Sequence, residues 1–600
     1  MRSPGTSRRG RAPVAPVGSG VIRDPVRSWA SAPALARAVA WACLGLLGLG
    51  LLGLGLRAAV PVLDQVFPAA IQVGTTQSVT LVGKFDPWPV KVDLDLPGVG
   101  WEATTNSGVL TVRVAASAPV GAHVIRVFSS EGVSAPRFLI LSPNPQRAEV
   151  EPNDSAATAQ PLTGLPTEVN GRLEKNGDVD SYAIDLRAGQ TLVARLEAYT
   201  LQSPLDPVLR LLDARGVQVA WNHDEVRSLD PLLVHRVEST GPHVLQVFGF
   251  AYPADSDLRF SGSPKGVYRL HATTDPVPRH AWPLGVGRSA NTRLGWADWG
   301  PEPVSAPVVD VPAGSIGPGA EVHPVVLPGR TIPLDVPVGD GPEGVESEPN
   351  DTAASAGRLE IPSAVSGDLD RAGDEDRYRV AARKGEALRL EIRASGLGFP
   401  LDAWLRIEDG AGKELARNDD AGGADPALDW TPPETAEVIL VVGNLLQRGG
   451  RDQRYRLSVE RPRPAWSATV PEASLALAVG ATNDWKVAVE RRHGSAERLR
   501  VSVVGLPPGV RVDPVEVPEK GTEAILRWIA ATNAGPFSGP FRVEVAGPDR
   551  VEAARFPLVS AGENNGVPQG FRRLVIESVR RLWLTVTVPT APAAAAADKK

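Results

Sequence analysis

Beyond residue 60, apolar and polar residues alternate along the chain in short runs. The run 388–393 alternates Leu, Leu and Ile with Arg, Glu and Arg, and similar alternation occupies 110–114, 485–489 and 499–503. Period-two alternation is typical of half-buried strands, because successive side chains point to opposite faces. Clusters of Gly, Pro, Asp and Asn separate the runs, as in β-sandwiches. The pattern predicts an all-β fold of tandem β-sandwich domains.

One apolar run near the N-terminus departs from this pattern. Residues 38–56 are uncharged over 19 positions and contain eight Leu and five Gly. As a helix they would span about 28 Å, close to the roughly 30 Å hydrocarbon core of a bilayer. Residues 1–37 hold seven arginines against one acid, and such an excess marks the cytoplasmic side. We therefore expect one transmembrane helix over 38–57, with the later domains outside the cytoplasm.

A cleaved signal peptide is the alternative interpretation of this run. Its apolar region is usually about 7–15 residues long and ends in small residues three positions and one position before the cut. Cleavage after Ala58 would put Leu56 at the first of these positions, and cleavage after Ala59 would put Arg57 there. Both are poor sites, so the sequence favours a single-pass membrane protein over a secreted one.

Composition narrows the function classes. The chain has 600 residues and a net charge of −6, and this length allows about three to six domains. Its mild acidity argues against a nucleic-acid partner, because such binders normally carry a clustered basic surface. The single cysteine, Cys43, lies inside the apolar run. The rest of the chain therefore offers no disulfide, thiolate zinc site or cysteine nucleophile.

An internal repeat organises the middle of the chain. The segment 149–155 reads Glu-Val-Glu-Pro-Asn-Asp-Ser, and 346–352 reads Glu-Ser-Glu-Pro-Asn-Asp-Thr. Further along, Gly-Asp-Val-Asp-Ser-Tyr at 177–182 recurs at 373–378 as Gly-Asp-Glu-Asp-Arg-Tyr, an offset of 196 residues. Repeats of this length indicate copies of one structural unit. The chain therefore contains two copies of one module.

The order of these motifs resembles the bacterial pre-peptidase C-terminal (PPC) domain. Both copies carry Glu-Pro-Asn-Asp, Gly-Asp-x-Asp-x-Tyr, Leu-Asp, Asp-x-x-Gly and Asn-x-Asp in order, and end in Tyr-Arg-Leu at 268–270 and 455–457. The resemblance implies a compact antiparallel β-sandwich, often appended to secreted peptidases as a binding or stabilising module. In the similar collagen-binding domains of clostridial collagenases, the equivalent acidic motifs hold calcium.

The flanking segments are similar to bacterial Ig-like domains. Residues 62–146 resemble the IPT/TIG type, and Phe67-Pro68 is echoed by Trp282-Pro283 in a region that reads as a degenerate copy or a linker. The predicted order is a basic cytoplasmic segment (1–37), a transmembrane helix or signal segment (38–57), an Ig-like domain (62–146), a first PPC-type sandwich (148–273), a degenerate Ig-like or linker region (276–343), a second PPC-type sandwich (345–461), a C-terminal Ig-like domain (465–590) and a tail (591–600).

The acidic motifs are the best candidates for a site. If a strand begins near Asp178, then Asp178 and Asp180 share the core-facing side with Tyr182. Buried unpaired carboxylates are strongly unfavourable, so they need a cation, N–H donors or a bend toward water. Sets of oxygen ligands suit Ca²⁺, whereas Zn²⁺ favours His or Cys. The alternative is that these acids cap turns and face solvent.

We predict one Ca²⁺ in each copy. The candidate ligands of the first copy are Glu149, Glu151, Asn153, Asp154, Asp178 and Asp180. Those of the second copy are Glu346, Glu348, Asn350, Asp351, Asp374 and Asp376.

Signatures of catalysis are sparse. The eight histidines show no His-Glu-x-x-His spacing, and the sequence has no Gly-x-Ser-x-Gly elbow and no Gly-x-x-x-x-Gly-Lys phosphate loop. We interpret His223 as a turn residue, since the second copy has Asp419 there. The tryptophans of 282–299 are interpreted as packing residues rather than a surface for stacking sugars or peptides.

The sequence therefore predicts no enzyme and no nucleic-acid partner. The expected function is that of a membrane-anchored, extracytoplasmic bacterial envelope protein for binding, adhesion or envelope assembly, with a protein or polysaccharide ligand. The alternative is an accessory or substrate-presenting partner of a secreted hydrolase or peptidase.

Overall fold

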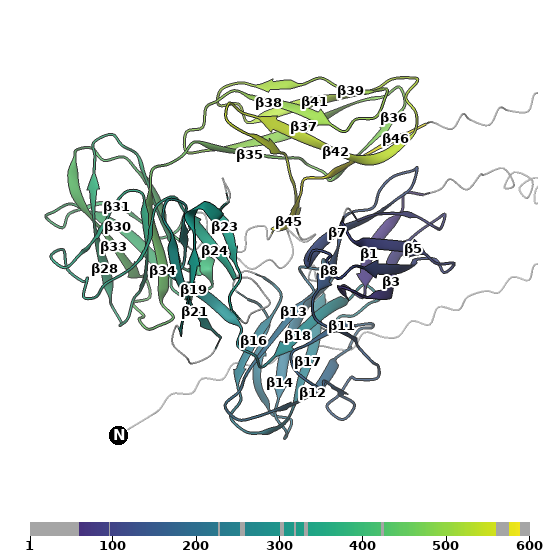
Figure 1. Ribbon diagram of the computed structural model, residues 1–600, viewed down its shortest axis with the longest axis horizontal. Helices are drawn as coiled ribbons and strands as arrows, with labels where there is room; N and C mark the ends of the chain where they lie inside the picture. The colour runs from purple at the N-terminus through teal and green to yellow at the C-terminus, as the bar shows by residue number, and fades with distance from the viewer. Residues whose placement is uncertain are drawn as a thin grey trace, which may run out of the picture. The chain divides into compact units, whose positions relative to one another are not determined.

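The chain is described by a computed structural model over residues 59–94, 96–225, 228–251, 259–299, 305–316, 320–328, 334–421, 425–559 and 575–588. Within these ranges it forms strands and two short 3₁₀ helices, η1 (Ala313–Ser315) and η2 (Ser395–Leu397) (Figure 1). The all-β class predicted from the sequence is confirmed. The predicted transmembrane or signal segment lies outside the described residues, and within them no helix is long and apolar enough to cross a bilayer.

The first segment predicted to be Ig-like folds as two four-stranded sheets around one core. The sheet orders are β1-β3-β6-β5 and β2-β8-β7-β4. Alternate residues turn inward, so Val79, Leu110 and Val127 are almost fully buried. The strands are β1 (Val62–Phe67), β2 (Ala70–Gln72), β3 (Thr76–Lys84), β4 (Lys91–Asp93), β5 (Val99–Ala103), β6 (Val109–Val114), β7 (Gly121–Phe128) and β8 (Arg137–Ser142).

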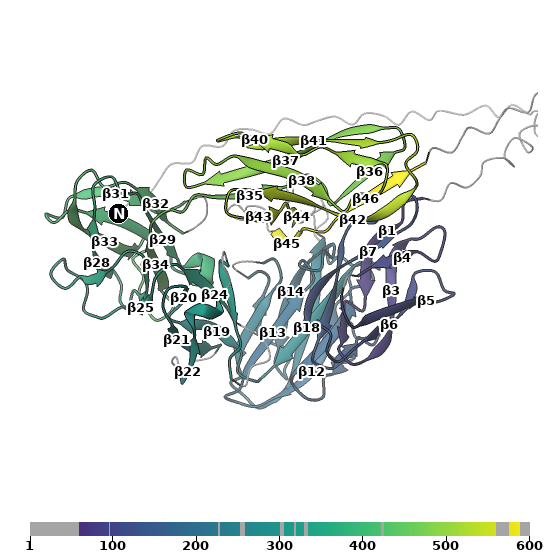
Figure 2. The same ribbon diagram turned by 45° about the horizontal axis from the view of Figure 1, so that its top comes forward.

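The first repeat, called here the first module (148–273), is a sandwich of two five-stranded sheets. Their orders are β10-β12-β17-β14-β15 and β16-β13-β18-β11-β9, and several of their strands can be followed in Figure 2. The strands are β9 (Gln146–Ala148), β10 (Gln160–Pro161), β11 (Thr167–Arg172), β12 (Asp180–Leu186), β13 (Thr191–Glu197), β14 (Leu205–Leu212), β15 (Gln218–Asn222), β16 (Leu232–Arg236), β17 (Gly241–Ala251) and β18 (Val267–Thr273).

The second module (345–461) repeats this topology strand for strand. Its sheet orders are β26-β28-β33-β30-β31 and β25-β27-β34-β29-β32. In each module one apolar core joins both sheets, so the repeat in the sequence is also a repeat of structure. The strands are β25 (Glu343–Val345), β26 (Gly357–Leu359), β27 (Ser363–Asp368), β28 (Glu375–Ala382), β29 (Leu388–Arg393), β30 (Ala403–Glu408), β31 (Glu414–Asn418), β32 (Ala427–Trp430), β33 (Ala436–Asn444) and β34 (Arg454–Glu460).

The region between the modules, predicted as a degenerate domain or a linker, contains two three-stranded sheets. Their orders are β19-β21-β22 and β20-β24-β23. Leu294, Trp296 and Val336 belong to their shared core. The strands are β19 (Pro278–Trp282), β20 (Val286–Gly287), β21 (Thr292–Asp298), β22 (Ser305–Val311), β23 (Val322–Val325) and β24 (Leu334–Gly339).

The C-terminal segment forms another large sandwich. Its main sheets have the orders β35-β37-β41-β39 and β36-β46-β42-β38-β40, with Trp485, Trp528 and Phe541 packed ring against ring in the core. The strands are β35 (Ala465–Thr469), β36 (Ser474–Ala478), β37 (Thr482–Arg492), β38 (Leu499–Val504), β39 (Val510–Val512), β40 (Val515–Val517), β41 (Glu523–Ala530), β42 (Phe537–Ala546), β43 (Val551–Ala553), β44 (Phe556–Val559), β45 (Val575–Val579) and β46 (Leu582–Thr587).

Candidate metal centre

Two stretches of the first module bring its acidic residues together. One is the segment 149–154, which follows β9, and the other is the turn that precedes β12. In that turn the N–H of Asp178 donates to the carbonyl of Lys175 at 3.2 Å, and Gly177 takes a φ of 87°, which favours glycine. The turn directs the side chains of Asp178 and Asp180 inward, and both residues are fully buried.

The first acidic cluster, defined as Glu149, Glu151, Asn153, Asp154, Asp178 and Asp180, has a compact inner part. Carboxylate oxygens of Glu149, Glu151 and Asp180 lie within 4.8 Å of one another. The backbone N–H of Asn153 donates to Glu151 at 2.9 Å, and its amide nitrogen lies 3.5 Å from Glu149. The structure thus places four of the six predicted ligands around one small volume.

Two buried tyrosine side chains lie next to this cluster. The hydroxyl of Tyr268 donates to Asp180 at 2.5 Å and lies 2.5 Å from the hydroxyl of Tyr182. Tyr182 is on β12 and Tyr268 on β18, so the pair connects the two sheets of the sandwich beneath the acids. Tyr182 belongs to the Gly-Asp-x-Asp-x-Tyr motif, but its contact with Tyr268 was not predicted from the sequence.

The second acidic cluster, defined as Glu346, Glu348, Asn350, Asp351, Asp374 and Asp376, repeats this geometry. Oxygens of Glu346, Glu348 and Asp376 again lie within 4.8 Å of one another. The hydroxyl of Tyr455 donates to Asp376 at 2.5 Å and lies 2.6 Å from that of Tyr378. The two copies therefore position the same side chains independently.

Three buried oxygens recur without a hydrogen-bond donor in each cluster. Among the described residues, Oδ1 of Asn153, Asp178 and Asp180 accepts no hydrogen bond. The same is true, within the described part of the second module, of the equivalent oxygens of Asn350, Asp374 and Asp376. Buried polar atoms are normally satisfied. Three equivalent exceptions in both copies are the pattern expected where a cation completes the site.

Burial also raises the pKa of the inner acids. Desolvation raises the pKa of Glu149 and that of Glu346 to about 7. Desolvation first, and the nearby Glu149 carboxylate second, raise the pKa of Asp180 to about 10. Asp376 follows the same pattern, with a pKa raised to about 9. The clusters therefore hold carboxylates that resist ionisation unless a positive charge is supplied.

A basic residue stands at the rim of each cluster. Lys175 Nζ lies 3.7 Å from Asp154 and 3.8 Å from Asp178. Arg371, which is 196 positions later, contacts Asp351 and lies 3.2 Å from Asp374. Sequence reasoning missed these cations, although the repeat offset would have identified them as equivalent positions.

A third group of possible ligands contains a histidine. The ring of His223 lies between two carboxylates, with Nε2 3.0 Å from Asp206 and Nδ1 3.6 Å from Asp224. The pKa of His223 is raised, mainly by the hydrogen bond to Asp206. Because the two carboxylates face different ring nitrogens, this arrangement suits a protonated imidazole that ties β14 to the end of β15.

The tryptophans of 282–299 pack against their surroundings. Trp296 is 3% exposed in the core of its two sheets. The guanidinium of Arg454 lies 4.9 Å from the ring centre of Trp282, and that of Arg279 lies 4.7 Å from the ring centre of Trp299.

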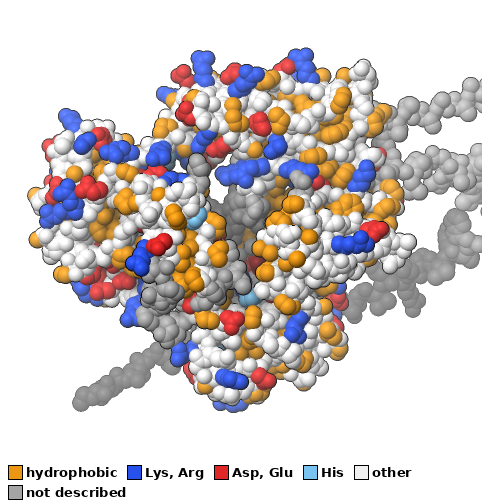
Figure 3. Space-filling model, in the orientation of Figure 1, with side chains coloured by type: hydrophobic (Ala, Val, Ile, Leu, Met, Phe, Trp, Pro, Cys, Tyr) orange, Lys and Arg blue, Asp and Glu red, His pale blue; other side chains and the backbone are white. Residues whose placement is uncertain are grey.

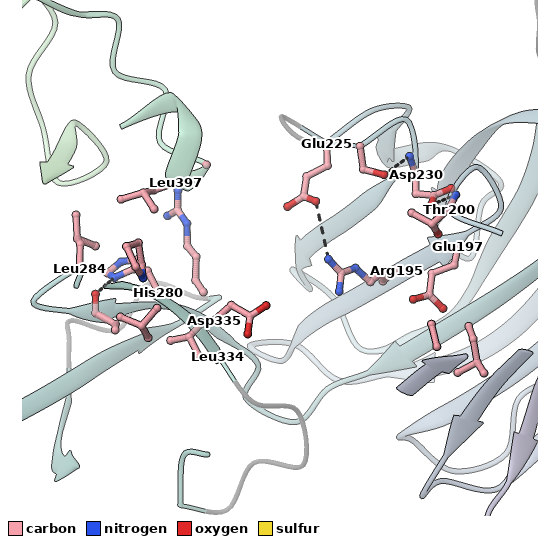
Figure 4. A pocket seen from close by; sticks show the side chains of 18 of the residues that line it. Arg195, Glu197, Thr200, Glu225, Asp230, His280, Leu284, Leu334, Asp335 and Leu397 are labelled. Atoms are coloured by element: carbon pink, nitrogen blue, oxygen red, sulfur yellow. Dashed lines mark hydrogen bonds and ion pairs between the residues drawn. The ribbon is translucent and has the colours of Figure 1, made fainter. Parts of the chain in front are cut away.

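Several of the polar groups that line the pocket in Figure 4 contact neighbouring residues. Asp230 accepts the N–H groups of Ala198 and Tyr199 at 2.8 and 2.7 Å and the hydroxyl of Thr200 at 2.7 Å. Arg195 lies 3.9 Å from Glu225. These contacts give the groups structural roles in holding loops.

Comparisons with known proteins give partial likenesses. No protein-family model matches the chain. A probable subtilase-type serine protease of Deinococcus radiodurans is 30% identical over 113 residues, which are 18% of this chain and 15% of that protein. The match therefore spans less than a sixth of the relative's length.

Among solved structures, the pre-peptidase C-terminal domain of a collagenase from Bacillus anthracis is 15% identical, covering 19% of this chain and 99% of that domain at a TM-score of 0.15. The four N-terminal Ig domains of Dscam1 isoform 8.4 are 9% identical, covering 89% of this chain and all of that one at a TM-score of 0.20. The strand topology defines the chain as a multidomain all-β protein with two copies of one acidic module.

Proposed function

We propose that this chain is a non-enzymatic, extracytoplasmic β-domain protein of the bacterial cell envelope. Residues 38–57 would anchor it in the membrane, and its modules would bind a protein or polysaccharide in adhesion or envelope assembly. On this reading, 148–273 and 345–461 are PPC-type modules with one structural Ca²⁺ each, flanked by Ig-like domains that include an IPT/TIG-type one. The calcium part of the proposal rests on the three buried side-chain oxygens in each cluster that accept no hydrogen bond from the described residues.

The chemistry of the donor set fits Ca²⁺. Each cluster offers only oxygen ligands and five formal negative charges, and Ca²⁺ takes about six to eight oxygens at flexible angles. A bound ion would complete the coordination of the orphaned oxygens and allow the inner acids to ionise. The acids would then reinforce the junction between 149–154 and β12 instead of weakening it.

The charge pattern on one face of the molecule supports a protein or polysaccharide ligand rather than nucleic acid. On the face shown in Figure 3, Lys and Arg side chains are interspersed with Asp and Glu rather than gathered in one basic stripe. Nucleic-acid binders concentrate positive charge to neutralise phosphates.

Calcium should raise the thermal stability of the full chain. Extracellular calcium modules bind at roughly 10⁻⁴–10⁻³ M, so about 1 mM Ca²⁺ at a Kd near 10⁻⁴ M adds about 1.4 kcal/mol per module. Calorimetric melts in Ca²⁺ and in chelator measure this difference. The double variant Asp178→Asn, Asp180→Asn should lose the calcium-dependent stabilisation of the first module. Identical melts in both conditions would refute the calcium sites.

A second candidate is an accessory or substrate-presenting partner of a secreted hydrolase. The likeness of 113 residues to part of a subtilase-type protease favours it. Capture from envelope extracts on the immobilised extracytoplasmic part separates the two functions. Recovery of a peptidase or glycanase supports the second candidate, and recovery of envelope polymer or of further copies of the chain supports the first.

A further inference from the structure

The basic residues at the rims of the two acidic clusters contact oxygens that the proposed ion would use. Oδ2 of Asp178 is fixed by the backbone N–H of Glu174 at 2.5 Å, and Oδ2 of Asp374 by that of Asp370 at 2.9 Å. In both residues Oδ1 is the oxygen that accepts no hydrogen bond among the described residues. Lys175 and Arg371 each approach this Oδ1, at 3.8 and 3.2 Å.

Both cations are exposed to solvent. The side chains of Lys175 and Arg371 are 66% and 56% exposed, whereas their aspartate partners in the turn, Asp178 and Asp374, are fully buried. Each basic residue lies three positions before its aspartate, in the turn ahead of β12 or β28. A long exposed side chain can therefore leave its carboxylate for solvent without any change in the strands.

The two positions also conserve charge but not shape between the copies. Lysine is a compact point charge, whereas arginine is a planar fork. The first cluster has the lysine and the second the arginine, and both reach the same pair of aspartates: Asp154 and Asp178, or Asp351 and Asp374. The common feature is one positive charge on a flexible stem.

We propose that Lys175 and Arg371 are tethered counter-cations that compete with the divalent ion for the acidic clusters. This inference rests on the calcium sites proposed above. Without an ion, each basic side chain partly neutralises its cluster and stabilises the ion-free module. When an ion binds, the side chain is displaced from Asp178 or Asp374, so its charge lowers the affinity of the site.

Electrostatics gives the direction and size of the effect. A unit positive charge about 5 Å from a divalent cation repels it even in a water-like medium, enough to lower the affinity about fifteenfold without salt and about fivefold at physiological salt. Salt screens the interaction between such exposed charges. If the basic residue only oriented the aspartates, its loss would have the opposite effect and would weaken ion binding.

The test measures calcium binding to the full chain in detergent, by titration calorimetry with Ca²⁺ alone as the ligand. Asp376→Asn serves as the parent, so that only the first cluster is observed. Adding Lys175→Met should tighten binding at least about threefold, and less in 0.5 M KCl. Lys175→Arg, which retains the charge, should stay within about twofold of the parent. Arg187→Met removes an exposed positive charge after the far end of β12 and should have no effect.

Thermal melts give a second readout. In chelator, Lys175→Met should melt below the parent, and the rise in its melting temperature on adding Ca²⁺ should exceed that of the parent. The mirror experiment places Arg371→Met in an Asp180→Asn background. Unchanged or weaker calcium binding by the Met variants overturns the tethered-cation proposal alone. Absence of binding by the parent chains overturns both it and the calcium sites.

Discussion

At the level of single residues, each acidic cluster places carboxyl groups against the apolar interior of a sandwich. Asp180 and Asp376 are fully buried, and a tyrosine hydroxyl donates one hydrogen bond to each. Ionisation of such groups is unfavourable in a medium of low polarity. In the ion-free protein the inner acids therefore hold protons near neutral pH, and binding of a divalent ion should release them.

The ion-free protein should lose stability as the pH rises from 5.5 to 8.5. The pKa of Glu149 and that of Glu346 are raised from 4.5 to about 7 in the folded state. Between these values the folded chain binds more protons than the unfolded chain, so the free energy of unfolding falls as the pH rises. The expected loss is on the order of 1 kcal/mol or more per module.

Urea unfolding in chelator at a series of pH values measures this loss. The double variant Glu149→Gln, Glu346→Gln should show a flatter profile, as should the wild type in saturating Ca²⁺. A free energy of unfolding that increases over this pH range in chelator would show that the inner acids are ionised without a metal.

At the level of elements, each cluster depends on a glycine that faces a tyrosine on the neighbouring strand. Gly171 on β11 pairs with Tyr268 on β18, and Gly367 on β27 pairs with Tyr455 on β34. A Cβ atom on Gly171 would overlap the Tyr268 ring, and one on Gly367 would overlap a carboxylate oxygen of Glu346 and lie 2.5 Å from the Tyr455 hydroxyl. The absent side chain thus provides the space in which the tyrosine reaches its aspartate.

Gly367→Ala should therefore disturb the second cluster through Tyr455 and Glu346. The displaced ring costs about 1–3 kcal/mol of stability, as overpacking usually does, and weakens calcium binding by the second module only. Gly344→Ala is the matched control, because its Cβ would make an ordinary contact at 3.7 Å. Calorimetric titration and thermal melts of both variants check this. If the two variants have the same stability and calcium affinity, Gly367 does not contribute to the calcium site.

The alternation of residues predicted the strands well where they are long and uninterrupted. The run at 388–393 is β29, and the run at 485–489 lies within β37. The same reasoning placed Asp178 and Asp180 on the core side with Tyr182, where all three are buried.

Other features could not be predicted from local pattern. The region 276–343 contains strands, but Pro278, Pro324 and Pro337 interrupt their alternation. The bond from Tyr268 to Asp180 joins residues 88 positions apart, and it depends on how the sheet that contains β18 packs against the sheet that contains β12. The contacts of Lys175 and Arg371 with the acidic clusters could also be recognised only from the fold, because a lysine in a turn is ordinarily a solvated residue.

At the level of the whole molecule, the proposed function requires that the β-sandwiches are anchored to the membrane outside the cytoplasm. If 38–57 is an uncleaved anchor, the full-length protein should remain with membranes after a carbonate wash. Arg27→Glu with Arg37→Glu should weaken its orientation, because cytoplasmic arginines set it. Mass spectrometry of the mature N-terminus is the check. A terminus near Val60 would show that the segment is a cleaved signal and that the protein is exported.

The central claim is that each acidic module holds one divalent cation. Equilibrium dialysis of the full chain against Ca²⁺, with bound metal counted by elemental analysis, tests it most directly. The expected result is two ions per chain, one ion after either Asp180→Asn or Asp376→Asn, and none after both. Binding of no ions by the wild type, or of two ions by the double variant, would contradict the assignment of these clusters as metal sites.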